Sequence, residues 1–244
     1  MGPSSPSAAD AAPPDPERDA GAVGTALAEV RRRIAAAAAA AGRRADAVTL
    51  VAVSKSQPEV RIVAALEAGQ RVFGENRVQE AQRRWPALRA RYPGVELHLV
   101  GPLQTNKLRD ALALFDVIQT LDREKLARAL AAEAARGARL PPLFIEVNVG
   151  AEPQKAGVPP EAAPRFIALC RDKLGLPVVG LMCIPPYGED PAPHFARLRD
   201  LARANGLPGV SMGMSGDYEL AVRLGATHVR VGTAIFGERA PRTG

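Results

Sequence analysis

The residue best suited to covalent chemistry in this sequence is Lys55, which directly follows the apolar segment 49–54 (TLVAVS). A segment this rich in β-branched and aliphatic residues is typical of a strand buried on both faces. The lysine is therefore predicted at the carboxyl end of a strand, where α/β folds place their chemistry. Arginine supplies most of the positive charge of the chain, but only a lysine amine can lose its proton and form an imine. The alternative is a surface lysine whose stem lies along a strand end.

Two segments near the carboxyl terminus have the composition of a phosphate site. Ser215 precedes Gly216, Asp217 and a predicted helix, so its hydroxyl can cap that helix and meet an anion there. Gly232 and Thr233 follow the last predicted strand, in a turn with free backbone N–H groups. Taken alone, each segment has an explanation without a ligand: Ser215 as a helix cap, and Gly232 with Thr233 as a turn. Together they favour phosphate, because the loops after strands seven and eight of a barrel often bind it.

Arg230 alternates with the apolar residues Val229 and Val231 in the last predicted strand. A buried arginine needs a partner, which is either a carboxylate or a ligand atom that must stay unprotonated. An amine, a phosphate site and a fixed cation at one mouth together suit a phosphorylated aldehyde bound as an imine. Pyridoxal 5'-phosphate (PLP) fits all three groups.

The positions of these residues follow from the predicted secondary structure. A leading helix is predicted over residues 23–41, and strand and helix patterns alternate regularly after it. Strands are predicted over residues 49–54, 71–74, 96–101, 116–120, 143–149, 178–184, 210–214 and 228–232. Helices are predicted between them over residues 60–68, 77–91, 106–114, 123–136, 161–173, 192–205 and 217–224. The alternation predicts an α/β protein with a single closed (β/α)8 barrel of the TIM type.

The barrel is predicted to occupy residues 21–244, after a disordered tail over residues 1–20 that is rich in Pro, Ala, Ser and Asp. An open doubly wound sheet is the alternative fold. It is disfavoured because no Gly-x-Gly-x-x-Gly motif follows the first strand.

Composition narrows the classes of function further. The chain has a net charge of +6, but its arginines are scattered and aromatic residues make up only 4%, which argues against nucleic-acid binding. No apolar stretch predicts a membrane span, and no spacing predicts a metal site. Cys170 and Cys183 are expected to be reduced, packed thiols of a cytoplasmic protein. His98 and His194 are expected to be structural.

Seven stretches, in order and at natural spacing, resemble one known family. They are LVAVSK (50–55), FGENRVQE (73–80), HLVGPLQTNK (98–107), VN with KAG (147–148 and 155–157), GLMCIP (180–185), SMGMSGD (211–217) and RVGTAIFG (230–237). The chain resembles the pyridoxal phosphate homeostasis proteins, single-domain relatives of the alanine racemase barrel, which is the fold type III PLP barrel.

The resemblance implies a set of cofactor contacts at the strand ends. They are Lys55, Asn76, Met214, Ser215, Arg230, Gly232 and Thr233. Lys55 would carry PLP as a Schiff base, Arg230 would face the pyridine nitrogen, and the serine, glycine and threonine would hold the phosphate.

A PLP-binding protein of intracellular PLP (vitamin B6) homeostasis is the function that we expect, without catalytic residues. An arginine at the pyridine nitrogen keeps the ring a poor electron sink, and the additional domain that brings a tyrosine base to alanine racemases is not expected here. A PLP-dependent racemase-like enzyme is the alternative, followed by an aldolase that uses Lys55 without a cofactor. The expected partners are PLP and apo PLP-dependent enzymes as acceptors, and a monomer is expected.

Overall fold

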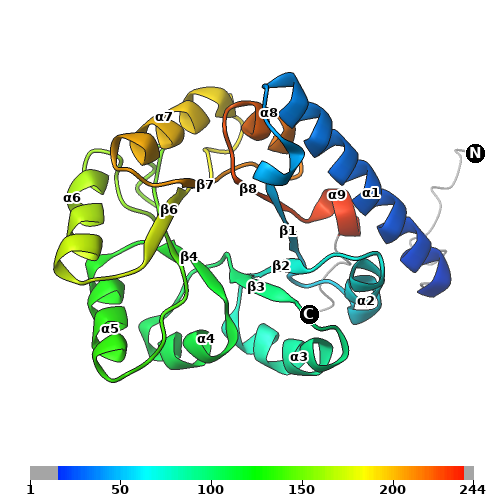
Figure 1. The fold of residues 1–244 in the computed structure, drawn as a ribbon, viewed down its shortest axis with the longest axis horizontal. Coiled ribbons are helices and arrows are strands. Elements are labelled where there is room, and N and C mark those ends of the chain that lie inside the picture. Colours follow the sequence, from blue (N-terminus) through cyan, green and yellow to red (C-terminus); the bar gives the residue numbers. More distant parts are fainter. Residues whose placement is uncertain (1–15, 239–244) are drawn as a thin grey trace, which may run out of the picture.

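Eight parallel strands close into a barrel in the order of the sequence (Figure 1). The structure is a computed structural model that describes residues 16–238, and their side chains from residue 21 onwards. The strands are β1 Thr49–Val53, β2 Val72–Glu75, β3 Glu96–Leu99, β4 Val117–Leu121, β5 Leu143–Glu146, β6 Val178–Met182, β7 Gly209–Ser211 and β8 His228–Val231. The pairing of β1 with β8 closes the ring, with Val51 opposite Arg230. The predicted barrel is confirmed, and the open sheet is excluded.

The helices form a layer outside the strands (Figure 1). They are α1 Pro16–Ala40, α2 Glu59–Glu67, α3 Val78–Arg91, α4 Leu108–Leu114, α5 Glu124–Ala135, α6 Ala163–Ala168, α7 Pro191–Ala204, α8 Tyr218–Arg223 and α9 Thr233–Phe236. Short 3-10 turns cover Ala45–Ala47 and Thr105–Lys107, and a π-helical turn covers Leu169–Lys173. Each predicted helix is present, although the one expected over residues 161–173 divides into α6 and the π-helical turn.

Two expectations about the ends of the domain need correction. Residues 16–20 belong to α1, so the helix begins within the segment that was expected to be disordered; residues 1–15 lie outside the described part of the chain, as do residues 239–244. Thr233 was expected in a turn, but it starts α9. Proline is favoured in the first turn of a helix because its missing N–H needs no partner there, which is consistent with a start at Pro16.

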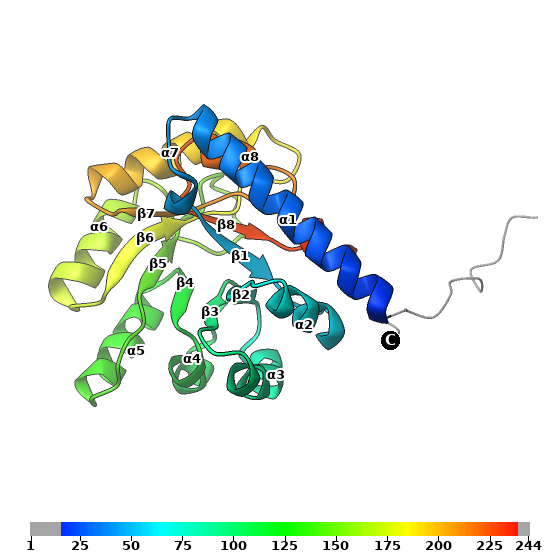
Figure 2. The same ribbon diagram turned by 45° about the vertical axis from the view of Figure 1, so that its right-hand side comes forward.

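Helix α1 packs against the outside of the barrel, where it contacts α2, α8 and α9 (Figures 1 and 2). Its buried side chains recur every three or four residues, as in an amphipathic helix: Val23, Leu27, Val30, Ile34, Ala37 and Ala38. The helix that follows β8, α9, has only four residues. We infer that α1 covers apolar surface that a longer eighth helix would cover in a regular (β/α)8 barrel.

The inside of the barrel is filled by side chains of two kinds. Val117, Phe144 and Met182 form a buried apolar cluster separate from the main core. Gly180 and Gly209 make room for it, because a Cβ on either residue would lie 2.5 or 2.8 Å from the Phe144 ring. The remaining inward positions include buried polar residues, among them His98, Gln119, Ser211 and Arg230. Between residues 16 and 238, no helix is long and apolar enough to cross a membrane.

Candidate functional site

Lys55 lies in the tight turn that leaves the carboxyl end of β1, as predicted. Its side chain is half-buried. The next residue, Ser56, has a φ of 58°, a left-handed conformation that is uncommon for residues other than glycine and carries strain. Strain of this kind persists only where surrounding contacts fix the backbone, so the neighbours of this turn are informative.

The turn is held by a buried carboxylate and an arginine from β2 and α3. Oε1 of Glu75, which is fully buried, accepts hydrogen bonds from Ser54 Oγ at 2.7 Å and Trp85 Nε1 at 3.1 Å. The Arg84 guanidinium donates to the carbonyl oxygens of Ser54 and Gln57 at 3.4 and 3.0 Å. It also lies 3.5 Å from Oε1 of Glu75. These contacts fix both ends of the turn, so the backbone that carries Lys55 is held in place before any ligand arrives.

Neither Arg84 nor Trp85 was identified from the sequence as part of this support. Both lie on α3, whose residues are distant from Lys55 along the chain. The one available signal was an acidic residue, Glu75, at the end of a strand that is otherwise buried, because a buried carboxylate requires partners. Burial raises the pKa of Glu75, against its hydrogen bonds with Ser54 and Trp85.

The loops after β7 and β8 meet at the hydroxyl of Ser215. Its Oγ accepts hydrogen bonds from the backbone N–H groups of Gly232 at 3.3 Å and Ala234 at 3.2 Å. The expected cap of α8 by Ser215 is therefore wrong: Asp217 is the N-cap residue of α8, and Ser215 lies at the start of α9. Two backbone donors and a hydroxyl thus gather where Thr233 begins that helix. Such a group of donors suits an anion.

Arg230 is 4% exposed, and its guanidinium reaches the carboxyl ends of β6 and β7 inside the barrel. Its Nη1 donates to Ser211 Oγ at 2.7 Å, and its Nη2 donates to the carbonyl oxygen of Cys183 at 2.8 Å. Within residues 21–238, no carboxylate forms an ion pair with it, so the alternative of a structural ion pair is not found. Burial lowers the pKa of the guanidinium. A buried cation with neutral partners retains N–H groups for a ligand acceptor.

Glu146, the last residue of β5, was not identified from the sequence. Burial raises the pKa of this carboxyl group to about 7; Asp122 raises it further, and Arg230 lowers it. Glu146 pairs in the sheet with Met182, the neighbour of Cys183, whose carbonyl oxygen accepts from Arg230, so the two groups lie in the same part of the barrel. Perturbed carboxyl groups are common at functional sites. The sequence signal was weak, because a glutamate at the end of a strand is usually exposed.

Asn76 and Met214, the two other expected site residues, lie at the same end of the barrel. A Cβ on Gly101 would lie 2.3 Å from the carbonyl oxygen of Asn76, so glycine allows the loops after β2 and β3 to touch. A cavity of about 400 Å³ beside these two loops is lined in part by Asn76, Gln104 and Lys107, but not by Met214. Met214 is 36% exposed, and its N–H donates to Asp217 Oδ1 at 2.6 Å.

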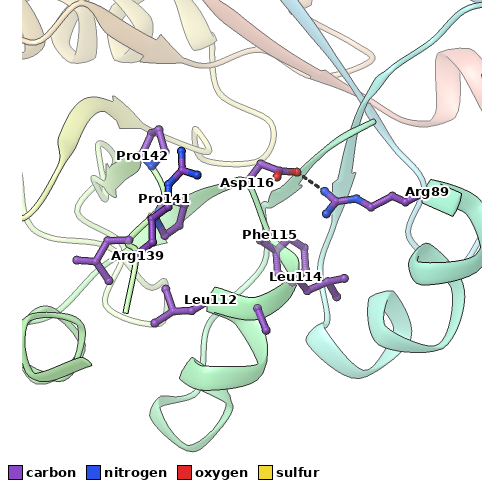
Figure 3. A pocket seen from close by; sticks show the side chains of 10 residues that line it. Arg89, Leu112, Leu114, Phe115, Asp116, Arg139, Pro141 and Pro142 are labelled. Carbon is purple, nitrogen blue, oxygen red and sulfur yellow. Dashed lines mark hydrogen bonds and ion pairs between the residues drawn. The ribbon is translucent and has the colours of Figure 1, made fainter. Parts of the chain in front are cut away.

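A different cavity, of about 280 Å³, lies at the opposite end of the barrel (Figure 3). Residues that precede β4 and β5 line it, including Phe115, Asp116 and Pro142. Arg89 forms an ion pair with Asp116 there. The amino-terminal face of such a barrel generally serves stability, and none of the expected site residues lies in this cavity.

Cys170 and Cys183 are buried and unpaired with each other, as expected. Burial raises the pKa of each thiol to about 12. Because the thiolate is the reactive form, we predict that the native protein reacts very slowly with a thiol reagent at pH 8, whereas the unfolded protein reacts at once. Rapid reaction of the folded protein would contradict this prediction. Among the described side chains, no group of His, Cys, Asp and Glu has the arrangement of a metal site.

The alanine racemase N-terminal domain family matches residues 26–240. The pyridoxal phosphate homeostasis protein of Pseudomonas aeruginosa is 44% identical over 220 residues, which cover 87% of this chain and 94% of the relative. The protein of the same name from Aquifex aeolicus is 39% identical over 222 residues, covering 87% and 96%.

Solved structures show the same similarity. PipY of Synechococcus elongatus, determined with PLP bound, is 36% identical and has a TM-score of 0.73, covering 88% of this chain and all of PipY (100%). Alanine racemase from Bartonella henselae, at 17% identity and a TM-score of 0.69, shares the fold over 91% of this chain and 62% of its own.

Proposed function

We infer that this chain, which belongs to the pyridoxal phosphate homeostasis protein family, binds PLP reversibly at the carboxyl end of its barrel and acts in PLP homeostasis. The observation that carries this inference is the convergence of three groups from distant segments. They are the amine of Lys55 on its clamped turn, the donors around Ser215 and the buried cation Arg230. The relative PipY was determined with PLP bound.

The residues present fit each part of this cofactor. The N–H groups of Gly232 and Ala234 already point at one oxygen, Ser215 Oγ, and a phosphate oxygen is a stronger acceptor than a hydroxyl. A side chain at Gly232 would approach the carbonyl oxygen of Val53 to 3.2 Å, so a glycine keeps this approach open. We propose that Ser215, Gly232 and Thr233 hold the phosphate, and that Asn76 and Met214 line the site.

Lys55 and Arg230 would act on the two ends of the ring system. The Lys55 amine would form a C=N bond to the aldehyde carbon, and the aldehyde oxygen would leave as water. An N–H of Arg230 would donate to the pyridine nitrogen and keep it unprotonated. When bound, PLP supplies an electron sink, and this contact would weaken that property.

A carrier is therefore the role that we propose, rather than an enzyme. The relatives are named homeostasis proteins. The thiol of Cys183, whose carbonyl oxygen accepts from Arg230, is held in its unreactive form by a pKa of about 12. Apo PLP-dependent enzymes are the acceptors that this role requires, and a monomer that works in the cytoplasm remains our expectation.

The test is an absorption titration of the protein with PLP, followed by borohydride reduction and peptide mass analysis. We expect a protein-bound visible band and a reduced adduct on the peptide that contains Lys55. Turnover of amino acids is measured on the same sample. Free-cofactor spectra without any adduct would refute the proposal, and turnover at roughly 1–10³ per second would identify an enzyme instead.

A further inference from the structure

A continuous chain of hydrogen bonds crosses the inside of the barrel from its amino-terminal end to Arg230. Arg230 Nη1 donates to Ser211 Oγ at 2.7 Å, and Ser211 Oγ donates to Gln119 Oε1 at 2.6 Å. The Gln119 amide Nε2 lies 2.8 Å from His98 Nδ1. His98 Nε2 lies 2.7 Å from Glu96 Oε1. The chain joins β8, β7, β4 and β3, and its three middle members are buried.

The chemistry of these groups permits one direction only. A guanidinium has no acceptor, so Ser211 must accept from Arg230 and pass its own proton to Gln119. The amide oxygen of Gln119 is then occupied, so its N–H donates to His98 Nδ1. The imidazole therefore carries its proton on Nε2 and donates it to Glu96. Each link of this hydrogen-bond chain therefore pairs one donor with one acceptor, as burial of polar groups favours.

The two ends of the chain carry opposite charges. The Glu96 side chain is 47% exposed at the amino end of β3, and its hydrogen bond with His98 lowers the pKa of Glu96. Arg230 at the other end has electrostatic neighbours in Glu146, Asp217 and Cys183, and it also acts on the charge of His228. Within residues 21–238, no side chain of these three neighbours forms a hydrogen bond or ion pair with the guanidinium. Apart from the carbonyl of Cys183, Ser211 is thus the contact that fixes its orientation.

We propose that Ser211, Gln119 and His98 are positioning residues that hold the Arg230 guanidinium in the orientation needed to donate to the pyridine nitrogen of PLP. The inference rests on the proposed function, because it concerns the same site. If a substitution removes one of these hydrogen bonds, the hydroxyl of Ser211 is free to rotate and the guanidinium loses its fixed acceptor. Binding through the phosphate and Lys55 then persists, but recognition of the ring nitrogen is lost.

The experiment compares two probes, PLP and its 1-deaza analogue, in which C–H replaces the ring nitrogen. Dissociation constants for both are measured by absorption titration of wild type, Gln119→Leu, Ser211→Ala and Gln119→Glu. Thr120→Val is the matched control, because Thr120 is the buried neighbour of Gln119 and donates instead to Gly101 O at 2.8 Å. Thermal unfolding checks that each variant is folded.

We expect wild type to prefer PLP over the analogue by about tenfold or more, as befits a lost hydrogen bond to a charged donor. Gln119→Leu and Ser211→Ala should reduce this preference to less than about threefold, whereas Thr120→Val should keep it. Gln119→Glu should also keep it, because a carboxylate accepts from Ser211 and a protonated His98 donates to it.

The outcomes separate the two inferences. If wild type binds PLP but does not distinguish the analogue, or if folded Gln119→Leu and Ser211→Ala retain the full preference, the positioning role is wrong and the carrier function stands. If wild type forms no bound band with PLP, the proposed function itself fails. A Gln119→Leu protein that does not fold leaves Ser211→Ala as the deciding variant.

Discussion

Replacing Lys55 with alanine should abolish the borohydride-stable adduct and weaken PLP binding on the order of a hundredfold, about 3 kcal/mol. The loss is large because a bond formed within an already bound complex benefits from a high effective concentration of the amine. Lys55→Arg should behave like Lys55→Ala, since a guanidinium keeps the charge but forms no imine. The readouts are the visible band, the reduced adduct and the dissociation constant.

Lys125→Ala is the matched control for this prediction. Lys125 lies exposed on α5 and contacts no part of the proposed site, so its removal should leave band, adduct and affinity unchanged. An adduct that persists in Lys55→Ala would mean that another amine reacts. Lys107, which lines the cavity beside Asn76, is one alternative, and peptide mass analysis would identify it.

The barrel was predictable because the same sequence pattern, a strand followed by a helix, recurs along the chain. Each buried strand reads as an apolar run and each helix as a three-to-four-residue pattern, and the alternation allows few folds. Strand ends were less predictable: β5 ends at Glu146 and β7 at Ser211, before the predicted limits at residues 149 and 214. At these residues the backbone stops pairing with the neighbouring strands and enters the loops at the carboxyl end of the barrel. The apolar sequence continues past this point and therefore does not indicate where the strand ends.

The site was predictable where one residue type carries the chemistry, as for Lys55 and Arg230. It was not predictable where the function of a residue depends on its partner across the barrel. Gln119 and Ser211 are ordinary polar residues in two separate strands, and only barrel closure brings them to 2.6 Å. The same applies to Ser215, whose partners lie after β8 rather than in the next helix.

Glu146 is expected to make the protein less stable as pH rises from about 4.5 to about 7. Its pKa is near 4.5 when unfolded and about 7 when folded, so within this window the folded state binds more protons and the free energy of unfolding falls with pH. The full shift corresponds to about 3 kcal/mol. Allowing for residual solvent at this site, we expect Glu146→Gln to be more stable than wild type by about 2 kcal/mol at pH 8.

The informative quantity is the difference in the free energy of unfolding between Glu146→Gln and wild type, because His228 changes stability with pH in the opposite direction. Burial lowers its pKa to about 4, so His228 makes the folded state more stable as pH rises from about 4 to 6.5. Urea unfolding of wild type and Glu146→Gln at pH 4.5 and 8 cancels this shared contribution. Glu161→Gln, at an exposed carboxylate, is the control and should change stability at neither pH.

Equal stability of Glu146→Gln and wild type at pH 8 would contradict this prediction. It would show that ionisation of the carboxyl group does not reduce the free energy of unfolding. A gain at pH 8 that vanishes at pH 4.5 would instead show that the chain tolerates an unfavourable carboxyl group beside Arg230. Proteins commonly keep such destabilising groups where a site needs them. The physical reason available here is electrostatic: at neutral pH a partly protonated Glu146 leaves the charge of Arg230 less neutralised, and therefore available to the ring nitrogen of the cofactor.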